Sequence, residues 1–330
     1  MTPIEILTAA ALFALGTVML ILGGNWFVDG AAGIARRLRM PEVLIGATVV
    51  SIGTTLPEVM VSASAAVSGH GEIAYGNAIG SILCNTGLIA AVTMAFRPYS
   101  VEKGGMKMPV LFFFIAAAFC AFNAYAFGQF SRLTGILLLG VFAVYIFLSV
   151  RKTGQGMALA AEPAPEEAGA EEEVPLWLDL LRLAGGAVLI AFGANFLVDN
   201  GTLLAQAMGV PESVIALTFV ALGTSLPELV TAVISIRKGH GALTLGNVIG
   251  ANLFNLVLVV GVSATLSPYR IPVGKTLFGM NAAMLVDLPL VFLAMGLLTL
   301  PTLKRGKTSR PQGIILLALY AAYCVFEFFL

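Results

Sequence analysis

Ten apolar segments run through this sequence, each about 20 residues long, which is the length an α-helix needs to cross the hydrocarbon core of a membrane. Only 11% of the 330 residues are charged, whereas soluble domains carry about 25%. The sequence therefore predicts an all-α polytopic membrane protein in contact with the lipid bilayer. The ten predicted spans lie near residues 5–27, 43–67, 75–96, 108–126, 133–150, 177–198, 212–236, 243–266, 280–300 and 311–329.

The distribution of Lys and Arg predicts which side of the membrane each loop faces, because cytoplasmic loops are enriched in both. Fourteen of the 18 follow odd-numbered spans: Arg36, Arg37, Arg39, Arg97, Lys103, Lys107, Arg151, Lys152, Arg237, Lys238, Lys304, Arg305, Lys307 and Arg310. We therefore expect a multi-pass protein of the cell (inner or plasma) membrane with both termini outside. The net charge is zero, and no basic patch indicates a nucleic-acid partner.

A stretch rich in Ala, Pro and Glu separates spans five and six. It reads GMALAAEPAPEEAGAEEEVP, a composition typical of a solvated and flexible segment. We expect a cytoplasmic linker over residues 153–175 that is too short to hold a folded regulatory domain. A cation-sensing role for its glutamates is left open.

The chain also matches itself when it is shifted by 170 residues. Residues 23–99 and 193–269 share 28 identities in 77 positions without a gap, which indicates an internal duplication. We expect a first five-span repeat over residues 1–152 and a second over 176–330.

Equivalent points of the two repeats are separated by five spans, which is an odd number. The repeats must then cross the membrane in opposite directions, related by a pseudo-two-fold axis in the membrane plane. Inverted repeats of five helices are characteristic of secondary transporters, whose substrate site lies near the midplane where the repeats meet. Polar residues inside the apolar spans of both repeats are therefore the candidates for that site.

Such polar residues gather in spans two and seven. Ser51, Thr54, Thr55 and Glu58 lie at steps of three and four, so they share one helix face. The second repeat has Ala221, Thr224, Ser225 and Glu228 at the equivalent positions. Each glutamate follows a proline, Pro57 or Pro227, and a proline inside a helix frees a backbone carbonyl one turn earlier.

Spans three and eight add a second pair of polar stripes. Asn77, Ser81 and Asn85 follow at steps of four, and the second repeat offers Asn247, Ala251 and Asn255. Oxygen ligands of this kind suit Ca²⁺ and Na⁺ rather than zinc or copper. Two ionised carboxylates at low dielectric repel each other, and a shared cation relieves both. We therefore interpret Glu58 and Glu228 as the two halves of a cation cage.

The motifs GTTLPE with GNAIGSILCN, and GTSLPE with GNVIGANLFN, resemble the paired alpha-repeats of the sodium/calcium exchanger family, the cation/Ca²⁺ antiporters. The resemblance covers both halves and is to prokaryotic-type members without a large regulatory loop. It implies Na⁺/Ca²⁺ antiport by alternating access, with Ca²⁺ and Na⁺ as substrates, no cofactor and no obligatory protein partner.

The resemblance also implies a set of ion ligands, which together form the cation cage. The family's ligands carry over to the carboxylates of Glu58 and Glu228, to Asn85 and Asn255, to hydroxyl or carbonyl oxygens of Thr54, Thr55, Thr224, Ser225 and Ser81, and to backbone oxygens near Ser51 and Ala221.

Three positions depart from the family pattern. Ile82 stands where asparagine is frequent, and Ala251 where serine is usual, which removes one expected Na⁺ ligand. Some family members have an aspartate at the position of Asn255, and the potassium-dependent members resemble this acidic pattern. We therefore do not expect potassium dependence.

Other readings of the sequence compete with this one. A Ca²⁺/H⁺ antiporter would use the same two glutamates as proton sites, and a channel would need a continuous pore. An enzyme is not expected, because the motifs contain no nucleophile–base pair.

Several residues outside the cage have plainer interpretations. We interpret Asp29 and Asp199 as span-boundary or capping residues, with a role in ion entry as the alternative. Asn77 and Asn247 are interpreted as helix-bridging residues, and His70 and His240 as turn residues, with pH sensing as the alternative for the histidines. The three cysteines, Cys84, Cys120 and Cys324, have no metal-ligand spacing, and the position of Asp287 is left open.

Overall fold

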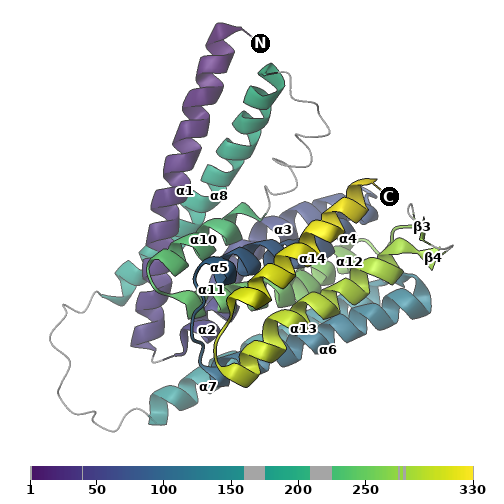
Figure 1. Ribbon diagram of the computed structural model, residues 1–330. Helices are drawn as coiled ribbons and strands as arrows, with labels where there is room; N and C mark the ends of the chain where they lie inside the picture. The colour runs from purple at the N-terminus through teal and green to yellow at the C-terminus, as the bar shows by residue number, and fades with distance from the viewer. Residues whose placement is uncertain are drawn as a thin grey trace.

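A computed structural model describes residues 2–38, 40–159, 175–208, 225–273, 276–277 and 280–329. In this part of the chain the protein is nearly all helical (Figure 1). The helices of the first half are α1 (Pro3–Arg37), α2 (Glu42–Ile45), α3 (Ser51–Val67), α4 (Gly71–Cys84), α5 (Ala91–Phe96), α6 (Lys103–Phe127) and α7 (Arg132–Leu159). Those of the second half are α8 (Leu176–Ala207), α10 (Leu226–Arg237), α11 (Gly241–Phe254), α12 (Gly261–Leu266), α13 (Leu288–Arg305) and α14 (Arg310–Phe329).

Short π-helical turns join several of these helices into longer spans. They are η1 (Gly46–Val50), η2 (Asn85–Ala90), η4 (Asn255–Val260) and η5 (Ala283–Asp287). With them, eight helical segments among the described residues are long and apolar enough to cross a membrane. Much of the predicted seventh span falls within residues 209–224, outside the described residues.

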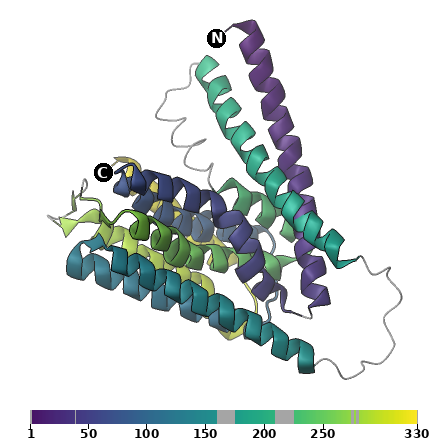
Figure 2. The same ribbon diagram turned by 180° about the vertical axis from the view of Figure 1, so that it is seen from behind.

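Helices α1 and α8 form an antiparallel pair that extends away from the remaining helices (Figures 1 and 2). Glycines allow the two backbones to touch. A Cβ at Gly16 would lie 2.8 Å from the Gly193 carbonyl oxygen, and one at Gly186 would lie 2.6 Å from the Gly23 carbonyl oxygen. Gly16 is equivalent to Gly186, and Gly23 is equivalent to Gly193. Exchanging the two repeats therefore converts one of these contacts into the other.

A second pair of contacts repeats this symmetry at the two ends of the molecule. The Tyr269 side chain fills the space beside Gly71, and the Tyr99 side chain fills the space beside Gly241. Each of these contacts becomes the other when the two repeats are exchanged. The described part of the chain therefore has the pseudo-two-fold arrangement that the sequence repeat predicts.

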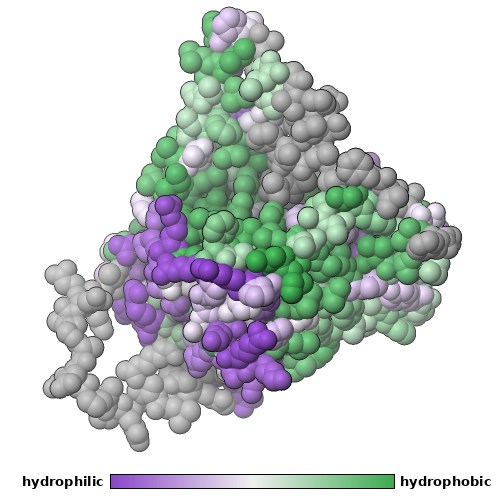
Figure 3. Space-filling model, viewed as in Figure 1, coloured by the Kyte–Doolittle hydropathy of each residue, from purple (hydrophilic) through white to green (hydrophobic). Residues whose placement is uncertain are grey.

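The loops after spans three, seven and nine meet at one end of the molecule. Arg97 Nη1 donates to the Ile236 carbonyl oxygen at 3.1 Å, and Lys103 Nζ donates to the Lys304 carbonyl oxygen at 2.8 Å. Much of the strongly hydrophilic surface visible in Figure 3 gathers toward this end. Three of the loops that the charge count assigns to one side are thus neighbours in space.

The remaining loops include short strands that the sequence did not predict. Strand β1 (Gln129–Phe130) pairs with β2 (Tyr269–Arg270), and β3 (Thr276–Leu277) pairs with β4 (Met280–Asn281). The first of these pairs joins the loop after α6 to the loop after α12, and so links the two repeats at the end opposite the basic loops.

Three helices run further than predicted. Helices α1 and α8 have 35 and 32 residues, which makes each about 50 Å long. Asp29 and Asp199 therefore do not cap these helices, because α1 continues to Arg37 and α8 to Ala207. Helix α7 continues to Leu159, seven residues into the predicted linker, and residues 160–174 lie outside the described residues.

The opposite orientation of the repeats can be tested at the two histidines. His70 and His240 precede α4 and α11 at the ends of equivalent turns, each with a glycine at positive φ (Gly69 at 83° and Gly239 at 87°). Single cysteines at 70 and 240, in a cysteine-free background, should react with an impermeant thiol reagent from opposite sides of the membrane. Labelling from the same side would contradict the inverted arrangement.

Candidate ion-binding site

The two glutamates of the predicted cage lie at the centre of the helix bundle. Glu58 on α3 is 0% exposed and Glu228 on α10 is 1% exposed. Their carboxylates lie close enough to repel each other. Helix α3 contacts both α10 and η4, and α10 contacts η2, so the motifs of the two repeats meet as the repeat argument requires.

Within the described residues, neither carboxylate has a hydrogen-bond partner for either oxygen. Thr54 lies beside Glu228, but its hydroxyl donates to Asn247 Oδ1 at 3.2 Å. A buried carboxylate without a partner is costly, and a second one beside it adds repulsion. Neutralisation of the pair by a cation or by protons would remove this cost.

Further buried oxygens of the predicted cage also lack partners. The Thr55 hydroxyl and the side-chain oxygens of Asn85 and Asn255 are buried and have no hydrogen-bond partner in the described part of the chain. Buried polar atoms are normally hydrogen-bonded, so a cluster of exceptions needs an explanation. Carboxylate, amide and hydroxyl oxygens are the ligands that hard cations prefer.

The two asparagines occupy a special place in the backbone. Asn85 begins η2 and Asn255 begins η4, so each π-helical turn starts at the equivalent residue of its repeat. π-Helical turns are rare in proteins as a whole, and those that occur often lie at functional sites. They interrupt the regular α-helical hydrogen-bond pattern. The sequence did not predict them.

Two other asparagines hold the glutamate-bearing helices in place. Asn77 Nδ2 donates to the Glu58 carbonyl oxygen at 3.2 Å and to Ser62 Oγ at 2.8 Å. Asn247 Nδ2 donates to Thr231 Oγ1 at 3.2 Å, and that hydroxyl donates to the Glu228 carbonyl oxygen at 3.0 Å. The interpretation of Asn77 and Asn247 as helix-bridging residues is confirmed.

The two prolines have different surroundings. Pro57 lies inside α3, as the sequence predicts. Pro227 instead lies in the first turn of α10, which begins at Leu226 after the undescribed residues 209–224. There its missing N–H removes no bond from the described helix, because the first amides of a helix have no intrahelical partner.

The remaining predicted ligands divide into three groups. Ser225 and Ser81 are buried, Ser225 directly before α10 and Ser81 on α4. Ser51 is buried, and its hydroxyl donates to the Gly46 carbonyl oxygen at 2.7 Å, so its side chain supports η1. Thr224 and Ala221 lie outside the described residues.

The structure adds a polar residue that the motif analysis passed over. Asn252 on α11 is 0% exposed; its Nδ2 donates to Thr86 Oγ1 at 2.7 Å, and its Oδ1 has no partner among the described residues. It lies one turn before Asn255. Asn252 belongs to the motif GNVIGANLFN, but its equivalent in the first repeat is Ile82, so the two repeats do not share an asparagine here.

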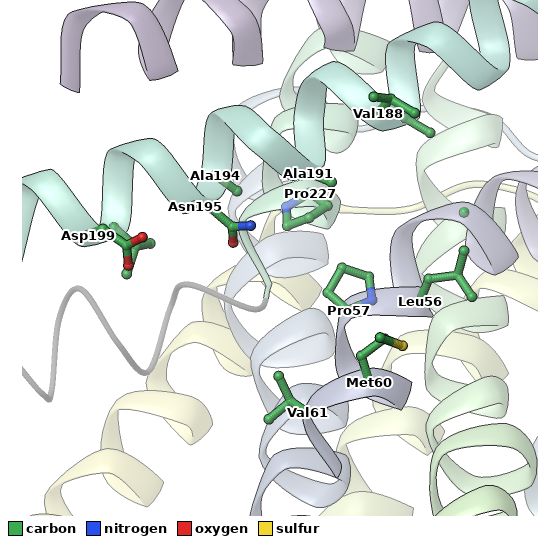
Figure 4. A pocket seen from close by; sticks show the side chains of 13 residues that line it. Leu56, Pro57, Met60, Val61, Val188, Ala191, Ala194, Asn195, Asp199 and Pro227 are labelled. Carbon is green, nitrogen blue, oxygen red and sulfur yellow. The ribbon is translucent and has the colours of Figure 1, made fainter. Parts of the chain in front are cut away.

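A cavity of about 600 Å³ approaches the site from one side, between α3 and α8. Its lining is mainly apolar and includes Pro57, Met60 and Pro227, with Asn195 and Asp199 on α8 further along it (Figure 4). A smaller cavity shares Pro57 and Pro227 with it and reaches Thr54. The larger cavity therefore leads from the α8 surface toward the cage.

Comparison with known proteins identifies the family. The family model described as sodium/calcium exchanger protein matches residues 8–151 and 178–329, so it covers both halves of the chain. The chain belongs to the sodium/calcium exchanger family. The resemblance noted in the motifs is confirmed, and the chain is a multi-pass membrane protein of a family of ion exchangers.

Full-length relatives support this assignment. The chain is 34% identical over 324 residues to a putative antiporter, CaxA, of Alkalimonas amylolytica, covering 96% of this chain and 98% of that protein. It is 29% identical over 350 residues to the sodium/calcium exchanger MaX1 of Methanosarcina acetivorans, covering 96% and 97%.

A solved structure of a relative has the same fold. The structure of the sodium-calcium exchanger NCX_Mj soaked with Na⁺ and Sr²⁺ matches with a TM-score of 0.80 at 30% identity, covering 98% of this chain and 99% of that one. The predicted fold class, ten membrane helices in two inverted repeats, is confirmed.

Proposed function

We propose that the protein exchanges Na⁺ for Ca²⁺ by alternating access, and that both ions bind in one cation cage between the repeats. The observation that carries this proposal is the pair of buried carboxylates, Glu58 and Glu228, which approach each other without hydrogen-bond partners in the described chain. Membership of a sodium/calcium exchanger family supports Na⁺ and Ca²⁺ as the two substrates.

The residues of the cage have distinct roles in this proposal. Glu58 and Glu228 neutralise a divalent cation, and Asn85, Asn255 and Thr55 complete its coordination with neutral oxygens. Thr54, Ser81 and Ser225, with Thr224 and the backbone near Ser51 and Ala221, would serve the Na⁺ ions. Asn77 and Asn247 fix the two glutamate-bearing helices and bind no ion.

The charge of the cage makes the exchange obligatory. An empty cage holds two negative charges, and moving them through a dehydrated intermediate is costly. Either one Ca²⁺ or a set of Na⁺ ions removes most of that cost. The loaded protein therefore changes conformation readily, whereas the empty protein does so rarely.

The α1–α8 pair is the element that we propose moves. It contacts the cage-bearing helices on two surfaces, α8 facing α3 and α1 facing α10. The 600 Å³ cavity lies on the first surface, which supports the assignment of this conformation to the state with the α3–α8 side accessible. Movement of the pair relative to the bundle would close this side and open the other.

We also propose that residues 1–152 and 176–330 are the two repeats, joined by the segment 153–175. With both termini outside, the segment and the basic loops would face the cytoplasm and the cavity would open outward. No protein partner and no cofactor are needed for this cycle, and its substrates are the ions themselves.

Uptake into proteoliposomes distinguishes the two forms of antiport. Vesicles loaded with Na⁺ and diluted into Na⁺-free medium containing Ca²⁺ should accumulate Ca²⁺, whereas vesicles with only an outward proton gradient should not. Raising external Na⁺ should raise the apparent KM for Ca²⁺ without lowering the maximal rate, because the ions share the cage. Uptake driven by the proton gradient alone would favour Ca²⁺/H⁺ antiport, and non-competitive inhibition by Na⁺ would contradict the shared cage.

A further inference from the structure

Lys238 ties α1 to the helices that carry the cage. It is the residue directly after α10, and its Nζ lies 2.7 Å from Asp29 Oδ1 on α1. The same nitrogen donates to the Asn25 carbonyl oxygen at 3.3 Å. One lysine therefore contacts two successive turns of the helix that we propose moves.

The surface beside this lysine is closely packed. At Gly24 of α1 an added Cβ would lie 2.8 Å from Val230 Cγ1, and it would overlap the Ile234 side chain. Both of these residues belong to α10. The α1–α10 side of the molecule is therefore closed in this structure.

Among the described residues, the equivalent surface of the other repeat borders a cavity instead of a packed contact. Ala194 on α8 is equivalent to Gly24, and Met60 on α3 is equivalent to Val230; both line the 600 Å³ cavity. Asn195 and Asp199, the equivalents of Asn25 and Asp29, line the same cavity (Figure 4). The acidic residue and its asparagine are thus present on both sides of the molecule.

The lysine is present on one side only. Lys238 is the C-cap of α10, and its equivalent, the C-cap of α3, is Ser68. Both repeats thus carry the acceptor for an ion pair, but only the second supplies a donor. This is a chemical difference between two otherwise equivalent surfaces.

We propose that Lys238 is an ionic latch that stabilises the conformation closed between α1 and α10, and that its absence at position 68 makes the two access states unequally stable. The proposal rests on the alternating-access function proposed above. The latch must break before α1 can move, and no matching ion pair from position 68 compensates on the other side. The exchanger therefore rests with the α3–α8 side accessible.

Equivalent cysteines on the two surfaces report the balance between the states. In a background with Cys84, Cys120 and Cys324 replaced by alanine, Asn25→Cys reports the latched surface and Asn195→Cys the open one. The full chain in lipid nanodiscs exposes both faces, and the alkylation rate with a water-soluble maleimide is measured for each cysteine.

Removing the latch should shift accessibility from one surface to the other. Lys238→Ser should raise the alkylation rate of the cysteine introduced at position 25 and lower that of the cysteine introduced at position 195. Their ratio should change about twofold to fivefold, as expected for a partly exposed ion pair. Adding Ser68→Lys to Lys238→Ser should shift the ratio further in the same direction. Arg237→Ser, which removes the neighbouring charge, is the matched control and should leave the ratio unchanged.

A charge exchange separates the latch from an effect on folding. Asp29→Lys combined with Lys238→Asp should restore the original ratio, whereas each single change should not. An unchanged ratio in Lys238→Ser, or a failure of the exchange to restore it, would overturn the latch. Saturating Ca²⁺ or Na⁺ should also change the alkylation rates at positions 25 and 195. If it changes neither rate, in the parent protein or in the Lys238→Ser variant, the alternating-access proposal is wrong regardless of the role of Lys238.

Discussion

Replacing Glu58 or Glu228 by glutamine is expected to lower Ca²⁺ uptake at least about a hundredfold, because the affinity of a Ca²⁺ site falls by orders of magnitude as charged ligands are lost. Each change removes one of the two negative charges that offset Ca²⁺, and a carboxamide oxygen is a weaker ligand than a carboxylate. Both side chains are nearly fully buried, so water cannot replace the lost charge. Uptake by Na⁺-loaded proteoliposomes measures the loss.

The folded state of these variants should survive, which makes the loss interpretable. Glutamine is similar in size and removes the repulsion between the carboxylates, so the melting temperature without Ca²⁺ should be equal or higher. Added Ca²⁺ should raise the melting temperature of the parent protein through binding, and should not raise that of the variants. Glu102→Gln, an exposed carboxylate at the start of α6, is the control. Near-normal exchange in either cage variant would refute the site.

Forcing α1 and α8 apart should lower both the stability of the protein and its rate of transport. At Gly186 an added Cβ would lie 2.5 Å from the Phe27 backbone nitrogen and 2.6 Å from the Gly23 carbonyl oxygen, and neither is the end of a flexible side chain. Gly186→Ala should therefore force the helices apart and destabilise the protein by about 1–3 kcal/mol. The melting temperature and the initial rate of Na⁺-driven Ca²⁺ uptake should both fall.

The neighbouring glycine provides the matched control for this prediction. At Gly185 the nearest atom to an added Cβ is Trp26 Cε3 at 3.8 Å, an ordinary contact. Gly185→Ala should be neutral or stabilising, since alanine favours a helix over glycine by about 1 kcal/mol. If the two alanine variants behave alike, the close α1–α8 contact does not contribute to stability or transport.

Much of the architecture follows from pattern alone, because the membrane leaves few alternatives. A backbone in hydrocarbon must satisfy its own hydrogen bonds, so apolar segments of this length become helices. The duplication and the odd number of spans then dictate opposite orientations. Glu58 and Glu228 could be identified as partners without coordinates, because each is costly alone and they occupy equivalent positions.

The sequence by itself determined the helical membrane fold, the two inverted repeats and the meeting of Glu58 with Glu228, since these depend on periodicity and symmetry that each repeat carries. Only the tertiary structure revealed the π-helical turns at Asn85 and Asn255, the close glycine contact of α1 with α8, and the full length of these helices. It also showed that the α1–α10 side is closed, where Lys238 forms an ion pair with Asp29, and that the α3–α8 side holds the cavity. Because the two repeats are equivalent, the sequence pattern is compatible with closure of either side. Which side is closed depends on packing between helices far apart in the sequence, and no local sequence pattern predicts that packing.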